Sequence, residues 1–114
     1  MVHLGTYHMN IEESNLATPV IEVGDRLGYV HIGENHRDYL GAAAIDFPVF
    51  SHAPNKIGYT GPITFESFSS AVVSPTLSND LAVWRNLWSE GDDLARRARS
   101  SIVDHIAAAN SVAA

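Results

Sequence analysis

Short strand-like segments alternate with helix-like segments along this chain, and this alternation is what most constrains its fold. Apolar and polar residues alternate, or apolar residues cluster, over residues 2–8, 28–32 and 63–66. Parallel strands need a long crossover between them, and the spacing of these segments supplies one. Two helices, over about 79–90 and 92–109, are predicted to close the chain. The sequence therefore predicts an α/β fold built on about three parallel strands.

Local signals refine this outline. Ser78 is a suitable cap for the first closing helix, whose Trp84 and Trp88 we expect in the core. A further helix is predicted to begin after Asp46, and Pro54 is expected to shorten or break it, since an interior proline costs about 3 kcal/mol.

Composition excludes several classes of function. The 114 residues include 7 Lys+Arg and 13 Asp+Glu, for a net charge of −6, and no cysteine. Nucleic-acid binding requires a basic face, so a nucleic-acid partner is not expected. No apolar run reaches the ~18 residues of a membrane span, and the first residues do not resemble a secretion signal. We expect a soluble, cytoplasmic protein of one domain over residues 1–114, without a membrane partner.

Polar side chains stand at the carboxyl ends of the predicted strands. His8, His31 and Glu66 each end one, and Arg37 follows shortly after the second. A single histidine at such a position is more often a hydrogen-bonded structural residue than a ligand. Three together are different, because the carboxyl ends of adjacent parallel strands converge, and this is where such folds place their sites. Imidazole and carboxylate groups together suit Mn²⁺, Co²⁺, Zn²⁺ or Mg²⁺.

Other motifs give no support. The chain has no His-Glu-x-x-His zinc motif, no glycine-rich phosphate loop and no Gly-x-Ser-x-Gly nucleophile turn. Glu12, Glu13 and Glu34 could be metal ligands, but solvent-facing positions on a helix start and a loop explain them better. His36 is expected to be a loop residue.

Three segments carry a resemblance to a known family. They read Tyr-His-Met-Asn-Ile-Glu-Glu over residues 7–13, Gly-Tyr-Val-His-Ile-Gly-Glu-Asn-His-Arg over 28–37, and Ile-Gly-Tyr-Thr-Gly-Pro-Ile-Thr-Phe-Glu-Ser-Phe over 57–68. Their order and spacing are similar to those of the D-tagatose 3-epimerase type of ketose 3-epimerase. That family lies within the xylose-isomerase-like superfamily of sugar isomerases and epimerases.

The resemblance implies a fold and a chemistry. The family folds as a (β/α)₈ TIM barrel, so this chain would be a carboxyl-terminal portion of it, an incomplete barrel. One divalent metal ion, Mn²⁺, Mg²⁺ or Co²⁺, binds two oxygens of an open-chain ketose and stabilises the enediolate formed at C3. Two glutamates then exchange the C3 proton from opposite faces. By position, His31 and Glu66 match metal ligands, Glu66 also matches a catalytic acid/base, and His8 and Arg37 match substrate-binding residues.

The chain also departs from the family pattern. The metal-binding aspartate of the family lies three residues before the first histidine, where this chain has Gly5. The first catalytic glutamate of the family lies on an earlier strand, upstream of the residues here. Two of four expected ligands and one of two acid/base groups are therefore present.

Three readings stay open. The chain is part of a metal-dependent ketose 3-epimerase, complemented by another chain; or it is an inactive truncated remnant; or it is a sugar-phosphate isomerase of the same superfamily, in which Arg37 binds the phosphate. Exposed sheet edges predict self-association or poor solubility. The expected partners are accordingly a ketose or sugar phosphate and a second or complementing chain.

Overall fold

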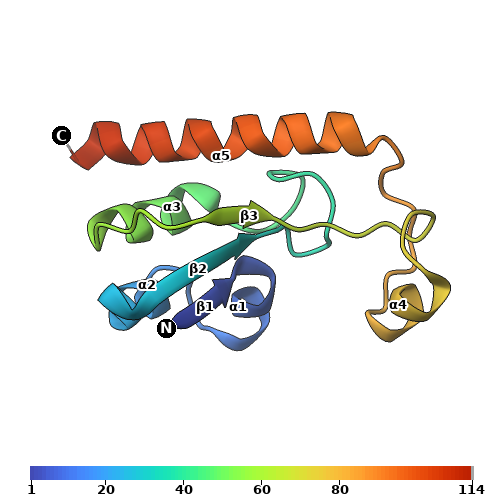
Figure 1. Cartoon of the computed structure of the whole chain (residues 1–114), viewed down its shortest axis with the longest axis horizontal. Helices are drawn as coiled ribbons and strands as arrows, with labels where there is room; N and C mark the ends of the chain where they lie inside the picture. Colours follow the sequence, from blue (N-terminus) through green and yellow to red (C-terminus); the bar gives the residue numbers. More distant parts are fainter. Residues whose placement is uncertain (114) are drawn as a thin grey trace.

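The computed structural model describes residues 1–113 and places three strands and five helices along them (Figure 1). In chain order they are β1 (Val2–Gly5), α1 (Thr6–Glu12), α2 (Thr18–Val23), a 3₁₀ turn (Gly24–Arg26), β2 (Leu27–Ile32), α3 (Phe47–Lys56), β3 (Ile63–Phe65), α4 (Pro75–Asp80) and α5 (Gly91–Ala113). Among these residues, none of the helices combines the length and the apolar character needed to cross a bilayer.

The three strands form one parallel sheet in the order β1-β2-β3. Gly5 of β1 lies beside His31 of β2, which in turn lies beside Thr64 of β3. The sheet confirms the predicted α/β class with parallel strands. Because the strands run in the same direction, their carboxyl ends meet along one edge of the sheet.

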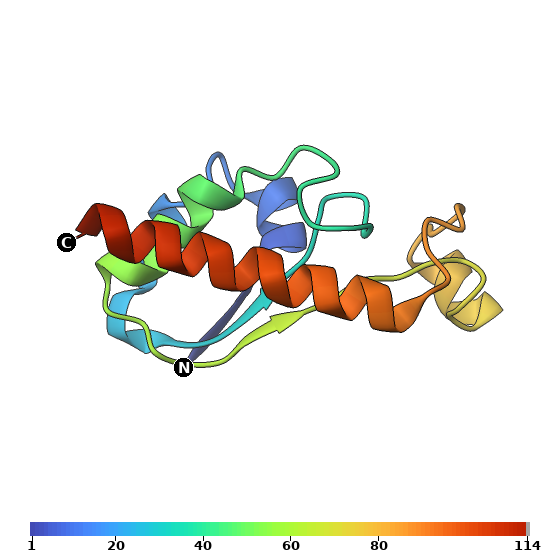
Figure 2. The ribbon, with the colours of Figure 1, turned by 90° about the horizontal axis from the view of Figure 1, so that it is seen from above.

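Helices cover one face of this sheet (Figure 2). In β2, Val30 and Ile32 are buried toward the helices, whereas Tyr29 and His31 alternate onto the opposite face. The core they enter consists of Met9, Val20, Leu27, Val30, Ile32, Ile45, Phe47, Phe50 and Ala53. Each large apolar side chain buried in this way contributes about 2 kcal/mol to the free energy of unfolding. This packing fixes which face of the sheet is left for polar groups.

The first strand is shorter than predicted. It ends at Gly5, and residues 6–12 form α1, so the prediction of a strand over 2–8 was wrong in its second half. The reason is a contact that pattern analysis does not detect: the buried hydroxyl of Thr6 donates to the carbonyl of Gly33 at 2.7 Å and accepts from the Gly33 N–H at 2.8 Å. This pair of bonds ties the start of α1 to the end of β2. His8 therefore lies on a helix, not at a strand end.

The predicted helix over 79–90 was also wrong. The structure instead has α4, six residues long, with the hydroxyl of Ser74 as its cap, accepting from the Leu77 N–H at 3.2 Å. Ser78 lies inside this helix and donates to the carbonyl of Val83. Ala82 adopts a left-handed backbone conformation, with φ of 54°, which ends helical geometry. Trp84 is 70% exposed, so the prediction that it lies in the core fails.

The remaining helices differ less from prediction. α5 extends over Gly91–Ala113 and begins with an ion pair between Asp93 and Arg97 at 3.1 Å. α3 is capped by Asp46, whose carboxylate accepts from the Val49 N–H, and it continues through Pro54. Pro54 has no backbone N–H and so removes one hydrogen bond of the helix. Because it lies near the carboxyl end of this ten-residue helix, only a short part of the helix follows it.

Candidate active site at the carboxyl edge of the sheet

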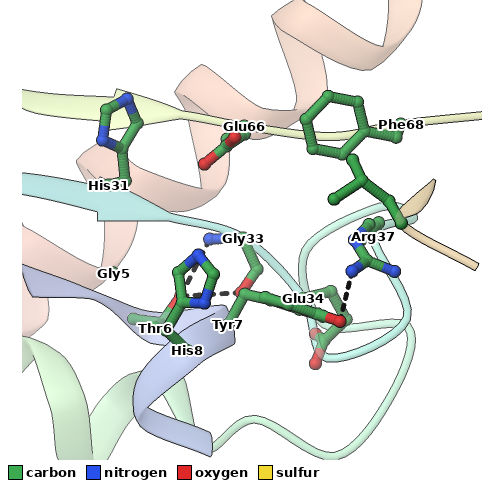
Figure 3. Close-up of a pocket in the computed structure, with 11 residues that line it drawn as sticks. Gly5, Thr6, Tyr7, His8, His31, Gly33, Glu34, Arg37, Glu66 and Phe68 are labelled. Atoms are coloured by element: carbon green, nitrogen blue, oxygen red, sulfur yellow. Dashed lines mark hydrogen bonds between the residues drawn. The ribbon is translucent and has the colours of Figure 1, made fainter. Parts of the chain in front are cut away.

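A small pocket opens at the carboxyl edge of the sheet, and it brings together all four residues that the sequence predicted for the site (Figure 3). Its volume is about 80 Å³. The lining residues are Gly5, Thr6, Tyr7, His8, His31, Gly33, Glu34, Arg37, Glu66, Phe68 and Leu81. They come from β1, α1, the end of β2, the loops after β2 and β3, and the residue that follows α4. The polar groups that were predicted to converge thus line one pocket in the structure.

His31 and Glu66 occupy neighbouring strand ends. His31 is the fifth residue of β2, and Glu66 directly follows β3, with its backbone N–H bonded to the Ile32 carbonyl at 2.9 Å. The strands come close here because Gly33 has no side chain: a Cβ at Gly33 would lie 2.8 Å from the Glu66 carbonyl oxygen. Figure 3 shows the Glu66 carboxylate on the His31 side of its strand.

Arg37 is held in a backbone conformation that is unusual for a side-chain-bearing residue. Its φ is 66°, in the left-handed region. The turn is closed by its N–H, which donates to the Glu34 carbonyl at 3.1 Å, and by its own carbonyl, which accepts from the Ser67 hydroxyl. Its guanidinium donates to the Tyr7 hydroxyl and lies over the Tyr7 ring. Strained residues of this kind are common where a side chain must be presented to a ligand.

Glu34 is the site residue whose environment sequence reasoning missed. We expected a solvent-facing loop residue, but its side chain is fully buried. The carboxylate accepts from the backbone N–H groups of Ile45 and Gly41, both at 2.9 Å, and from that of Asn35 at 3.2 Å. It therefore organises the loop that carries Arg37. The run of small residues at 41–44 is the available signal, because its first residue, Gly41, and the residue after it, Ile45, supply two of the three N–H donors.

Of the other candidates, Glu12 and Glu13 are exposed, as expected. His36 lies in the loop after β2, 3.9 Å from Asp38. None of these three residues lines the pocket that holds His31 and Arg37, but Glu12 and Glu13 line an adjoining cavity together with His31 and Glu66.

The donor set can be tested against a divalent metal ion. His31 and Glu66 are donors of suitable chemistry, but residues 1–113 contain no group of three or more His, Cys, Asp or Glu side chains that could hold one. One expected donor is missing at Gly5, the position at which the family resemblance implies a metal-binding aspartate. A Cβ there would make ordinary contacts, 3.6 Å from His8 Cδ2 and 3.8 Å from His31 Cβ, and its extended backbone admits any residue. The described residues therefore do not form a metal site by themselves.

Comparison with known proteins gives closely similar sequences. The chain is 63% identical over 97 residues to an L-ribulose 3-epimerase of Methylomonas sp. (strain DH-1), covering 85% of this chain and 34% of that protein. It is 50% identical over 111 residues to a ketose 3-epimerase of Arthrobacter globiformis, covering 97% of this chain and 38% of that protein. The chain thus spans about a third of the length of these curated relatives. No family model matches it.

Comparison with solved structures agrees. A D-allulose 3-epimerase from Methylomonas sp., solved in complex with D-allulose, superposes with a TM-score of 0.88 at 59% identity, covering 92% of this chain and 36% of that one. The parallel strands and their helices thus match a part of these TIM-barrel epimerases. By sequence and by fold, the chain belongs to the ketose 3-epimerases of the xylose-isomerase-like superfamily, as a carboxyl-terminal part of their barrel.

Proposed function

We propose that this chain supplies part of the active site of a divalent-metal-dependent epimerase that inverts C3 of a ketose. The observation that carries the proposal is the single pocket lined by His8, His31, Arg37 and Glu66. Proteins similar to this chain are named as 3-epimerases of ribulose, psicose or allulose. The activity of the whole protein is part of the proposal, because this chain spans about a third of those relatives.

In this proposal Glu66 is the group that moves a proton. A carboxylate at the pocket wall can take the proton from C3 or return it, provided that C3 lies within hydrogen-bond reach. His8 and Arg37 bind oxygens of the sugar near C1 and C2. The guanidinium offers several N–H donors in a fixed plane, and an imidazole donates or accepts according to its tautomer. These two groups would fix which carbon faces Glu66.

His31 and Glu66 would contribute two ligands to the metal, and the remaining donors would come from other parts of the epimerase. When bound, a divalent cation would polarise the ketose carbonyl and offset the negative charge that develops as the C3 proton leaves. Mn²⁺, Mg²⁺ and Co²⁺ are each compatible with an imidazole and a carboxylate.

The test is complementation. This chain would be mixed with the amino-terminal two thirds of the Methylomonas relative, with D-allulose and Mn²⁺, and conversion to the C3 epimer followed by chromatography. We expect conversion by the mixture, and loss of conversion by a factor of about 10³ or more with Glu66→Gln, which cannot transfer the proton. Glu22→Gln is the matched control, because Glu22 is exposed on α2 and lines neither of the cavities that Glu66 lines.

The inactive-remnant reading rests on Gly5. If the mixture is inactive but becomes active with Gly5→Asp, the chain has lost catalysis through that one residue and our proposal fails for the natural sequence. If both are inactive, the proposal fails altogether. Turnover of a ketose phosphate in preference to the free ketose would favour a sugar-phosphate isomerase, with Arg37 on the phosphate.

A further inference from the structure

We propose that Tyr7 is a positioning residue that orients both Arg37 and His8 toward the sugar. This inference rests on the proposed function for its ligand, since Arg37 and His8 are the residues assigned to substrate oxygens. Its structural part, that Tyr7 fixes the two side chains, stands on contacts within the chain.

Tyr7 contacts both groups through a single ring. The Cζ atom of Arg37 lies 3.9 Å from the ring centroid, and the guanidinium also donates a hydrogen bond to the Tyr7 hydroxyl. The His8 imidazole meets the same ring edge to face, with 5.2 Å between centroids and 82° between planes. Figure 3 shows Tyr7 extending from α1 toward Arg37, with His8 beside it.

The ring is itself attached to a fixed part of the molecule. Its neighbour Thr6 is fully buried and makes two hydrogen bonds to the backbone of Gly33. A tyrosine side chain has two rotatable bonds before its hydroxyl, whereas an arginine side chain is long and has many rotamers. The rigid α1–β2 junction therefore holds Tyr7 in place, and Tyr7 in turn restricts the rotamers of the flexible Arg37 side chain.

The backbone of Arg37 is fixed separately. Its left-handed turn is closed by Glu34 and by Ser67, which bond to the backbone of Arg37, whereas Tyr7 contacts the guanidinium. With the backbone and the guanidinium both held, one face of the guanidinium is covered by the ring and one N–H is taken. The opposite face and the remaining N–H donors are left for hydroxyl oxygens of a ligand.

Two variants separate the two contacts. Tyr7→Phe keeps the ring and removes the hydrogen bond, and Tyr7→Leu removes both. The matched control is Tyr39→Phe, because Tyr39 also lies under an arginine, with 5.0 Å from Arg97 Cζ to its ring centroid, and does not line the pocket. All three are compared with the natural chain for thermal unfolding, so that a loss of folding is recognised.

The first measurement needs no activity. The Nε–Hε signal of Arg37 is recorded by ¹⁵N–¹H NMR and assigned by its absence in Arg37→Lys. We expect a resolved signal, displaced by the aromatic ring, in the natural chain and in Tyr39→Phe. It should move partway to the random-coil position in Tyr7→Phe and fully in Tyr7→Leu, at an unchanged unfolding midpoint for Tyr7→Phe. An Arg37 signal already at the random-coil position, or one unchanged by both variants, overturns the proposal.

The second measurement is binding of D-allulose by the same proteins. Tyr7→Phe should weaken it by about tenfold, the factor that 1.4 kcal/mol represents, while Tyr39→Phe should leave it unchanged. Equal affinities for the natural chain and Tyr7→Phe would overturn the positioning role. If the natural chain does not bind the ketose at all, the proposed function fails for this chain, and the NMR result still decides whether Tyr7 fixes Arg37.

Discussion

The Nε2 atom of His3 lies 2.5 Å from the Nδ1 atom of His31, across the β1–β2 pair. One of the two nitrogens donates and the other accepts, so the Nδ1 side of His31 is engaged within the sheet. Its Nε2 atom is available to a ligand in the tautomer in which His31 Nδ1 carries the proton and donates it to His3 Nε2. A second group that holds a metal-binding histidine in this way fixes both its tautomer and the orientation of its ring.

Gly5→Asp should create a metal-binding pocket. The new side chain would add a carboxylate beside His31 and Glu66, at a position with space for a Cβ and with extended backbone. We expect the affinity for Mn²⁺, measured by calorimetry, to rise at least tenfold over the natural chain, because a second carboxylate joins the imidazole and the carboxylate already present. Gly5→Asn is the matched control, since it has nearly the same shape without the charge. Equal affinities for the two variants would contradict the assignment of this position.

His3→Ala, made in the Gly5→Asp background, should weaken Mn²⁺ binding by about tenfold or more, the range seen when a partner of a metal-binding histidine is removed. Calorimetry gives the affinity, and His52→Ala is the control, because His52 belongs to α3 and does not line the pocket. A stronger affinity without His3 would show that His3 competes with the metal for His31.

Glu34→Gln should destabilise the chain although it preserves shape. Both oxygens of Glu34 accept backbone N–H bonds, from Gly41 at 2.9 Å and from Ile45 at 2.9 Å, so the amide NH₂ group of glutamine must face one N–H donor. We expect a loss of about 2–4 kcal/mol in the free energy of unfolding, measured by urea denaturation. The exposed Glu13→Gln should change it by less than about 0.5 kcal/mol. A Glu34→Gln variant as stable as the natural chain would contradict the account of this loop.

The pKa of Tyr39 is raised above its ordinary 10.0, first by desolvation and then by its hydrogen bond to the Asp93 carboxylate. Because the folded state holds this proton more tightly than the unfolded state, stability should be unaffected below pH ~10 and should fall as the pH rises through the titration of the phenol. Urea titrations between pH 8 and pH 11 check this. Tyr39→Phe should remove that part of the alkaline loss, and an unchanged profile would contradict the coupling.

The chain should self-associate as its concentration rises. β1 and β3 are the outer strands of the described sheet, and each has one edge without a strand partner among residues 1–113. Unpaired backbone groups at sheet edges favour pairing with another chain. Sedimentation velocity should show larger species at higher concentration, and addition of the amino-terminal part of a relative should reduce them. A single sharp monomer at all concentrations, with a cooperative melt, would rule this out.

The sequence predicted the parallel sheet and the members of the pocket more closely than it predicted the local path of the chain. His31 and Glu66 could be placed because parallel strands with apolar cores end at a common edge, a rule that depends only on periodicity. His8 was assigned to the pocket but to the wrong element. Its helix begins where it does because Thr6 bonds to Gly33, 27 residues away, and no local pattern shows such a contact.

Burial was the harder property. A glutamate in a polar loop reads as solvated, and Glu34 is fully buried only because the loop folds back to present N–H groups to it. The helical spacing of Trp84 with other apolar residues predicts a buried position. The left-handed backbone of Ala82 ends the helix before Trp84, so this apolar face does not form. In both cases the deciding interaction depends on the path of the backbone.

The hydrogen bonds that shape the pocket have a consequence for inheritance. Thr6 with Gly33, Glu34 with its loop, and Tyr7 with Arg37 are all pairs within residues 1–113. A stretch of gene encoding this portion could therefore be exchanged among relatives as a block, carrying the orientation of its site residues with it. The geometry around Arg37 should survive such an exchange, because both partners of each of these hydrogen-bonded pairs move together.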